Sequence, residues 1–106
     1  MIIYLSGKMT GLPDYGRSAF EAAARELELR GHVVLSPATL PDGLKYEQYM
    51  RIDFAMVQEA DAICMLPGWE SSNGANAEKE FARELGLPVY FLSNLLAANI
   101  GIKEAG

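Results

Sequence analysis

One glutamate falls on a helix face where an apolar side chain would be expected. Counting back by helical spacing from Ala82 and Leu85, which are predicted to face the core, places Glu78 on the same inward face. A carboxylate there is costly unless it is paired or takes part in chemistry. Glu78 is therefore the first candidate for a nucleophile or acid-base group, although it could instead cap its helix or lie exposed at the sheet edge.

The start of the same helix could bind an anion. Ser72 and Gly74 lie at its expected N-terminus, where free backbone N–H groups and the helix dipole attract negative charge. Taken alone, Ser72 is more typical of an ordinary N-cap.

Two aspartates are further candidates. Asp53 is spaced four residues from Tyr49 and three from Met56, so it falls on or beside the apolar stripe of its helix. Asp61 directly precedes a buried strand, which places it at the strand's N-terminal end and favours a simple turn residue. Either carboxylate could assist Glu78 if the fold brought them together.

The first loop offers small and cationic groups. It begins Ser6, Gly7, Lys8 and Met9, and it matches neither the Walker A pattern nor the Gly-x-Gly-x-x-Gly pattern. Lys8 and Arg17 could donate to a phosphate, although each alone is more often a solvated surface charge.

An indole occupies a later loop. Trp69 lies between Gly68 and Glu70, and an exposed indole can either stack on a planar base or anchor a subunit interface. The sequence favours neither interpretation over the other.

These residues are carried by alternating strands and helices. Apolar runs predict strands over 2–6, 33–35, 62–66 and 89–92. Helical periodicity predicts helices over 18–30, 46–60 and 74–85, with a short helix over 93–99 and a frayed end. Ser18 followed by Glu21 is a capping-box pattern at the start of the first helix. In the second helix, Ile52 is predicted to share the apolar face with Tyr49.

The pattern predicts an α/β fold. The strands are continuous apolar runs, which indicates burial on both faces. Right-handed crossovers then give a small doubly wound sheet of the flavodoxin or Rossmann kind. We expect four parallel strands in the order 2-1-3-4 with helices on both faces, and ligands at the carboxyl ends of the strands.

Length and composition limit the function classes. The 106 residues form one expected domain, with a core over 2–92 and a short terminal helix and tail over 93–106. Nine basic residues against 14 acidic ones give a net charge of -5, which argues against polymeric nucleic acid. A chain this small leaves little room for a deep cleft, so we expect a homodimer or higher homo-oligomer to complete a site.

Metal and membrane chemistry are not expected. The single cysteine, Cys64, lies in a buried strand and excludes an internal disulfide or a multi-cysteine zinc cluster. No apolar run approaches the length of a membrane span, and the N-terminus lacks a signal-peptide pattern, so a cytoplasmic protein is expected. No metal site and no cofactor are predicted.

The chain resembles the nucleoside 2-deoxyribosyltransferase-like superfamily, most closely its small phage-associated members of uncharacterised function. The resemblance spans about residues 2–92, and its most specific part is the pattern Ser/Asp-x-Gly-x-x-x-Glu. The matching segments are Ile3–Gly11, Tyr49–Asp53, Ala60–Ile63, Leu66–Glu70 and Ser72–Glu78.

The resemblance implies roles for three residues. Glu78 matches the nucleophile that attacks C1′ of a 2′-deoxyribonucleoside and forms a covalent deoxyribosyl-enzyme. Ser72 matches the residue that helps bind the 5′-phosphate in relatives that hydrolyse deoxynucleoside monophosphates, where the transferases have an Asp. Asp61 matches an Asp that positions the substrate or assists the leaving base.

The resemblance therefore implies an N-glycosidase acting on 2′-deoxynucleoside 5′-monophosphates, or a deoxyribosyltransferase, with a small nucleotide or nucleoside as its partner. Besides Ser72, residues implied in substrate binding are Ser6, Gly7, Lys8, Met9, Arg17, Asp53, Trp69 and Gly74. Two alternatives stay open: a non-catalytic nucleotide-binding or sensing module, and a small dimeric interaction protein.

Overall fold

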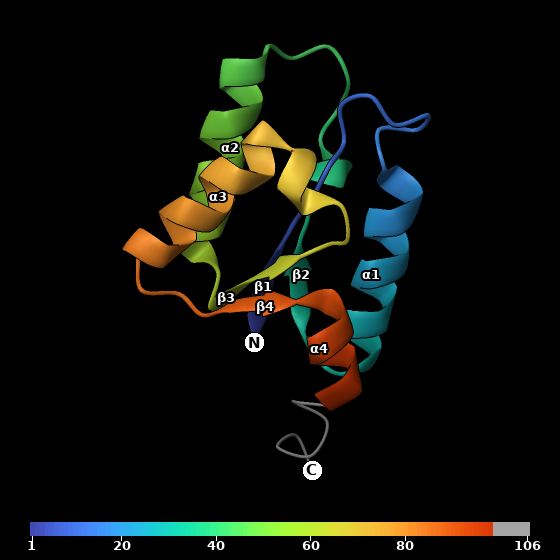
Figure 1. Cartoon of the computed structure of the whole chain (residues 1–106), viewed down its shortest axis with the longest axis vertical. Helices are drawn as coiled ribbons and strands as arrows, with labels where there is room; N and C mark the ends of the chain where they lie inside the picture. The colour runs from blue at the N-terminus through green and yellow to red at the C-terminus, as the bar shows by residue number, and fades with distance from the viewer. Residues whose placement is uncertain (99–106) are drawn as a thin grey trace.

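The described part of the chain folds around a four-stranded parallel sheet with helices on both faces (Figure 1). The computed structural model describes residues 1–98. The strands are β1 (Ile2–Ser6), β2 (Val33–Leu35), β3 (Ala62–Met65) and β4 (Val89–Phe91). The α-helices are α1 (Arg17–Leu29), α2 (Tyr46–Glu59), α3 (Asn73–Glu84) and α4 (Leu92–Ala98).

The strand order β2-β1-β3-β4 confirms the predicted α/β fold and its topology. All pairings are parallel, with Ser6 of β1 beside Met65 of β3 and Met65 beside Phe91 of β4. Strand order reverses between β1 and β3, so a crevice is expected beyond the carboxyl ends of these two strands.

Two apolar clusters hold the layers together. On one face of the sheet, Ile3 and Leu5 pack with Phe20 of α1 and Leu95 of α4. On the other face, Tyr4 packs with residues of α2 and α3, including Val57 and Ala82. Figure 1 shows α2 and α3 on the left of the sheet and α1 and α4 on the right. Alternate side chains of β1 therefore enter two different layers.

The first helix begins differently from the prediction. Ser18 lies inside α1, and Glu21 is exposed on its surface. The carboxylate that caps the helix belongs to Asp14, which accepts from the backbone N–H groups of Gly16 (2.9 Å) and Ser18 (3.0 Å) and also from the Ser18 hydroxyl. The capping-box prediction was therefore wrong, because the loop before the helix supplies the cap.

A glycine closes the first loop. Gly16 has a positive φ of 73°, and a Cβ at this position would lie 2.7 Å from the carbonyl oxygen of Lys8. A side chain would therefore strain the backbone and also collide with it. The close approach brings the two ends of the loop together above β1.

Two apolar faces also differ from expectation. In α2 the buried residues are Asp53 and Val57, while Ile52 is 37% exposed, so the inward stripe runs through Asp53 itself. In α3, Leu85 follows the last helical residue and is 44% exposed, although Ala82 is fully buried.

The other boundaries of the helices and strands agree with the predicted ones to within one or two residues. β3 and β4 each end one residue before their predicted ends, and short 3-10 helices at Pro37–Thr39 and Trp69–Ser71 lie in predicted loops. The predicted residue Asn99 of the last helix and the frayed end at 101–106 lie outside the described residues. Among residues 1–98, none of the helices has the length and apolar character needed to cross a membrane.

Candidate functional site

Polar side chains of β1 meet polar side chains of two helices inside the α2/α3 layer. Side chains alternate along a strand, so Tyr4 and Ser6 point to the same face of the sheet. The Ser6 hydroxyl donates a 2.6 Å hydrogen bond to Oε1 of Glu78 on α3. Ser6 is fully buried and Glu78 is 4% exposed. Glu78 thus occupies the inward position that helical spacing predicted.

Asp53 of α2 points toward the Glu78 carboxyl. It is 6% exposed, and its Oδ1 has no hydrogen-bond partner among the described residues. Loss of hydration raises the pKa of Asp53, and burial together with the Asp53 carboxyl raises the pKa of Glu78 to about 9. Two buried carboxyls this close cannot both ionise readily, so the pair holds a proton at neutral pH.

A tyrosine completes the group. Tyr4 lies fully buried on β1, and its hydroxyl has no partner within residues 1–98. Burial and the two nearby carboxyls raise the pKa of Tyr4 well above its usual value, so this phenol stays neutral. It can donate to a carboxylate or to a bound molecule.

A cavity of about 380 Å³ opens above these carboxyls. Its walls come from the first loop, the loop after β2, and the N-terminal halves of α2 and α3. Its volume suits a mononucleotide-sized ligand. Of the predicted site residues, those that line it are Gly7, Met9, Arg17, Asp53, Ser72, Gly74 and Glu78.

The N-terminus of α3 forms one wall. The Ser72 side chain caps the helix by accepting from the N–H of Ala75 at 3.1 Å. Gly74 has no side chain, and a Cβ there would lie 3.5 Å from the sulfur of Met50 and 4.0 Å from the Tyr46 hydroxyl. The wall therefore presents helix N–H groups with a neutral cap, which suits an anionic ligand.

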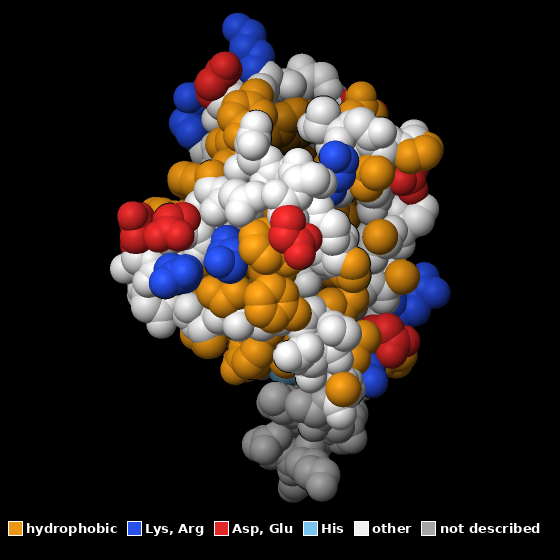
Figure 2. All heavy atoms as spheres, viewed as in Figure 1, with side chains coloured by type: hydrophobic (Ala, Val, Ile, Leu, Met, Phe, Trp, Pro, Cys, Tyr) orange, Lys and Arg blue, Asp and Glu red, His pale blue; other side chains and the backbone are white. Residues whose placement is uncertain are grey.

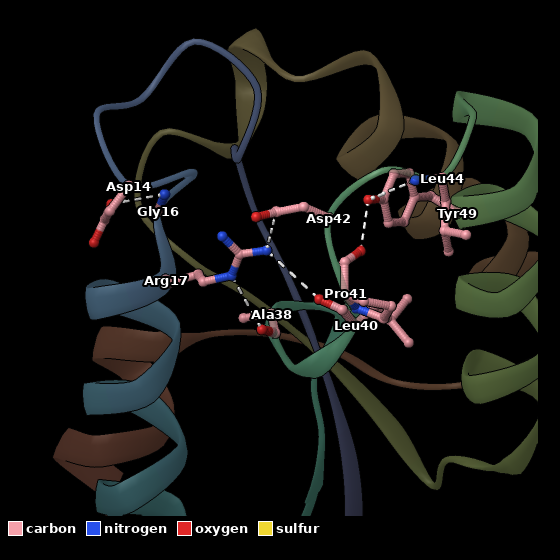
Figure 3. A network of polar contacts seen from close by, with 9 residues as sticks. All are labelled: Asp14, Gly16, Arg17, Ala38, Leu40, Pro41, Asp42, Leu44 and Tyr49. Carbon is pink, nitrogen blue, oxygen red and sulfur yellow. Dashed lines mark hydrogen bonds and ion pairs between the residues drawn. The ribbon is translucent and has the colours of Figure 1, made fainter.

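An ion pair forms the opposite wall (Figure 3). Arg17 donates to Asp42 at 2.7 Å and also to the carbonyl oxygens of Ala38 and Leu40. Asp42 raises the pKa of Arg17 further. Through these contacts α1 holds the loop after β2 beside the cavity.

A tyrosine of α2 fixes the far side of that loop. The Tyr49 hydroxyl donates to the carbonyl oxygen of Pro41 at 2.7 Å and accepts from the N–H of Leu44 at 3.3 Å (Figure 3). Loop residues 37–44 are thus held from both α1 and α2.

The structure separates two predicted site residues from the cavity. Asp61 lies at the N-terminal end of β3, where its Oδ2 accepts from the N–H of Ile2 at 2.8 Å. Parallel strands put this end of the sheet opposite the end that carries Ser6. Lys8 points instead to the loop after β3, with its Nζ 3.3 Å from the Ser71 hydroxyl.

Trp69 also lies outside the cavity lining. Its ring packs near Phe91 of the edge strand, with centroids 6.1 Å apart, and the Lys79 ammonium lies 5.2 Å from its centroid. Phe91 is 41% exposed. In the space-filling view, apolar side chains gather on the face that carries β4 and α4 (Figure 2). These contacts place the half-buried indole beside β4, outside the cavity lining.

Sequence reasoning missed several residues of the site, among them Tyr4, Asp42 and Tyr49. Tyr4 was part of an apolar run, yet its two-residue spacing from Ser6 could have marked a polar face of β1. Asp42 lies in a loop rich in Pro and Gly, where its pairing with Arg17 has no local signal. Among the described residues, no group of three or more His, Cys, Asp or Glu could hold a metal ion.

The sequence matches one family model over residues 1–91, described as "Domain of unknown function (DUF4406)". The chain belongs to this family. No curated protein matched the sequence.

Solved structures share the fold of this DUF4406 chain. A 2-desoxiribosyltransferase from Leishmania mexicana is 20% identical with a TM-score of 0.70, and the match covers 85% of this chain and 62% of that one. A 2-deoxyribosyltransferase from Bacillus psychrosaccharolyticus is 22% identical with a TM-score of 0.64, and the match covers 86% of this chain and 71% of that one. The CMP N-glycosidase BcmB of Clostridium botulinum is 18% identical with a TM-score of 0.65, and the match covers 95% of this chain and 84% of that one.

These likenesses confirm that this DUF4406 chain has the 2-deoxyribosyltransferase fold. The chain spans less than two thirds of the Leishmania protein. Fold alone does not fix the reaction, which must be argued from the side chains of the site.

Proposed function

We propose that this protein cleaves the N-glycosidic bond of 2′-deoxynucleoside 5′-monophosphates through a covalent deoxyribosyl-Glu78 intermediate. The observation that carries the proposal is the buried pair of Glu78 and Asp53 beneath a mononucleotide-sized cavity. Nucleophilic attack needs one ionised carboxyl, and departure of the base is helped by one protonated carboxyl. A pair that shares one proton can supply both.

Asp53 takes the acid-base role in place of Asp61. It shares the cavity with Glu78, whereas Asp61 lies at the opposite end of β3. At rest Glu78, with its pKa of about 9, holds the shared proton. In the reactive form this proton lies on Asp53, from which it passes to the departing base as the ionised Glu78 bonds to C1′. The resulting Asp53 carboxylate can then take a proton from the water that attacks C1′ and releases the sugar.

The two walls of the cavity favour a nucleotide over a free nucleoside. The N-terminus of α3 can bind a 5′-phosphate, because Ser72 is a neutral cap that adds no negative charge there. On the opposite wall the charge of Arg17 is paired with Asp42, so the phosphate is assigned to the N-terminus of α3. The fold neighbours add support, since their names give deoxyribosyl transfer and N-glycosidic cleavage of CMP.

A direct assay tests the proposal. The protein is incubated with each deoxynucleoside monophosphate, with CMP, and with the matching nucleosides, and free base is separated by chromatography. We expect base release from at least one deoxynucleoside monophosphate, and adding a second base distinguishes hydrolysis from transfer.

Two variants on α3 serve as a matched pair. Glu78→Gln should reduce base release by at least a thousandfold, while Glu80→Gln, an exposed change on the same helix, should retain it. Release that persists in Glu78→Gln would reject Glu78 as the nucleophile. No release from any substrate by the wild-type protein would reject the proposed function.

A further inference from the structure

We propose that Ser6 is a positioning residue that holds Oε1 of Glu78, so that Oε2 is the oxygen that attacks the sugar. This inference rests on the proposed function and assigns one of its steps to named atoms. It also gives Ser6 a role toward the enzyme's own carboxyl, in place of the substrate contact that the sequence implied.

The backbone that carries the Ser6 hydroxyl is held in place. Ser6 ends β1 in register with Met65 of β3, and its carbonyl oxygen accepts from the N–H of Leu66 at 2.8 Å. Its neighbour Gly7 leaves no spare room, since a Cβ there would lie 3.0 Å from the Leu66 side chain. The Ser6 side chain therefore starts from a fixed point of β1, within 2.6 Å of Oε1 of Glu78.

The two carboxyl oxygens of Glu78 have different surroundings. A serine hydroxyl has a single proton, and Ser6 gives it to Oε1 at 2.6 Å inside the protein. Glu78 also lines the cavity. Oε2 is therefore the oxygen left to meet a sugar held there.

The same hydrogen bond can persist through both chemical steps. When Oε2 bonds to C1′, the C1′–N bond breaks, and the base leaves with the electron pair and a proton from Asp53. Oε1 then becomes the ester carbonyl oxygen and still accepts from Ser6. When water attacks C1′, its proton passes to Asp53 and the C1′–Oε2 electron pair returns to the carboxylate. Ser6 stabilises that returning charge.

Ser6 also opposes the groups that keep Glu78 protonated. The titratable side chains that face Glu78 are Tyr4 from β1 and Asp53 from α2. Burial and Asp53 raise the pKa of Glu78, whereas the Ser6 hydroxyl lowers it, because a donor favours the charged form. Arg17 and Asp42 stand across the cavity as a mutual pair.

The first test reads Glu78 directly and needs no activity. The protein is labelled with 13C at the glutamate carboxyls, and the signal absent from Glu78→Gln is followed by NMR against pH. Ser6→Ala removes one oxygen atom and should move the Glu78 midpoint up by about one pH unit. Ser6→Thr keeps the hydroxyl and should keep the wild-type midpoint.

Cys64→Ala is the matched control. It also removes one buried atom from a sheet strand, but Cys64 lies in the α1/α4 layer, away from Glu78. Its Glu78 midpoint should equal that of the wild type. A midpoint unchanged in Ser6→Ala, or shifted equally in Cys64→Ala, would overturn the role of Ser6.

The second test uses the reaction. In Ser6→Ala, the acidic limb of the rate profile should move to higher pH by the same amount as the NMR midpoint. Loss of the donor should also slow ester breakdown, so deoxyribosylated protein accumulates and is detected by its mass after acid quench. A wild-type protein without glycosidase activity would reject the proposed function, whereas an active protein with an unchanged Ser6→Ala profile would reject the role of Ser6 alone.

Discussion

The carboxyl groups of Asp53 on α2 and Glu78 on α3 are neighbours beneath the cavity, and each residue is more than nine-tenths buried. Burial raises the pKa of both carboxyls, and Asp53 raises that of Glu78 further. Such a pair is costly for folding, because the unfolded chain can ionise both groups freely. That cost makes this pair a strong sign of function within residues 1–98.

The first prediction concerns stability against pH. The folded pKa of Glu78, about 9, exceeds its ordinary value of 4.5, so the folded chain holds a proton that the unfolded chain releases between these values. The free energy of unfolding should therefore fall as pH rises from 5 to 8, by ~2–4 kcal/mol.

Urea unfolding at the two pH values checks this expectation. Glu78→Gln cannot ionise, so its stability should decline far less over the same range. Glu80→Gln, on the exposed side of the helix, should follow the wild type. A Glu78→Gln protein that loses stability as steeply as the wild type would contradict the assignment of the raised pKa to Glu78.

The second prediction separates the two aspartates. Asp53→Asn should lower base release at least a hundredfold, because the leaving base loses its proton donor. It should also lower the pKa of Glu78, because the Asp53 carboxyl, which raises that pKa, is replaced by an amide that cannot ionise. Asp61→Asn keeps an oxygen that can accept from the N–H of Ile2, so base release should stay within about twofold of wild type. Measured kcat and the Glu78 carboxyl titration decide between them, and a loss confined to Asp61→Asn would restore Asp61 as the catalytic carboxyl.

Local patterns in the sequence predicted most of the fold and the inward position of Glu78. Apolar runs located all four strands, and helical spacing placed Glu78 inward from Ala82, even though Leu85 proved exposed. Asp53 was predicted to lie on or beside the apolar stripe of its helix, and it is buried there. The resemblance pointed to Asp61, which the strand direction places at the opposite end of β3 from the cavity.

Contacts between distant segments could not be predicted in this way. Arg17 and Asp42 are 25 residues apart, and their pairing depends on how α1 packs beside the loop after β2. The cap by Asp14 depends on the left-handed backbone of Gly16, which no helical pattern specifies. Such contacts form only in the assembled fold, because the sequence around each partner carries no pattern that identifies the other.

The third prediction tests the closed first loop through two glycines. Gly16→Ala imposes both an unfavourable φ and a contact of 2.7 Å with the Lys8 carbonyl oxygen. Gly11→Ala has a similar φ of 89° with nothing within 4 Å, so it carries the backbone cost alone. We expect Gly11→Ala to lower the free energy of unfolding by about 1 kcal/mol and Gly16→Ala by about 2–3 kcal/mol. Equal effects in thermal unfolding would show that the loop does not close on Lys8.

The fourth prediction concerns the wall formed by Arg17. Arg17→Ala removes the ion pair with Asp42 and frees the loop at Ala38 and Leu40, so substrate should be positioned poorly. KM for the nucleotide should rise about tenfold or more, with a smaller change in kcat. Arg25→Ala, an exposed change on the same helix, is the control and should leave both constants unchanged. A pure kcat defect in Arg17→Ala would indicate that this wall does not bind substrate.

The last prediction asks whether the N-terminus of α3 binds the 5′-phosphate. Ser72→Asp retains a good N-cap, because a carboxylate oxygen can accept from the N–H of Ala75 as the hydroxyl does, so the fold should keep its stability. The added negative charge should repel a dianionic phosphate but not a neutral nucleoside. KM for deoxynucleoside monophosphates should therefore rise at least tenfold, while cleavage of the matching nucleosides stays the same or improves.

Steady-state kinetics on both substrate forms, at low and high salt, measures the change in preference. Salt should weaken the penalty, since screening reduces repulsion between partly exposed charges. An equal loss on nucleotide and nucleoside would mean that Ser72 supports the helix alone, and that the phosphate binds elsewhere in the cavity.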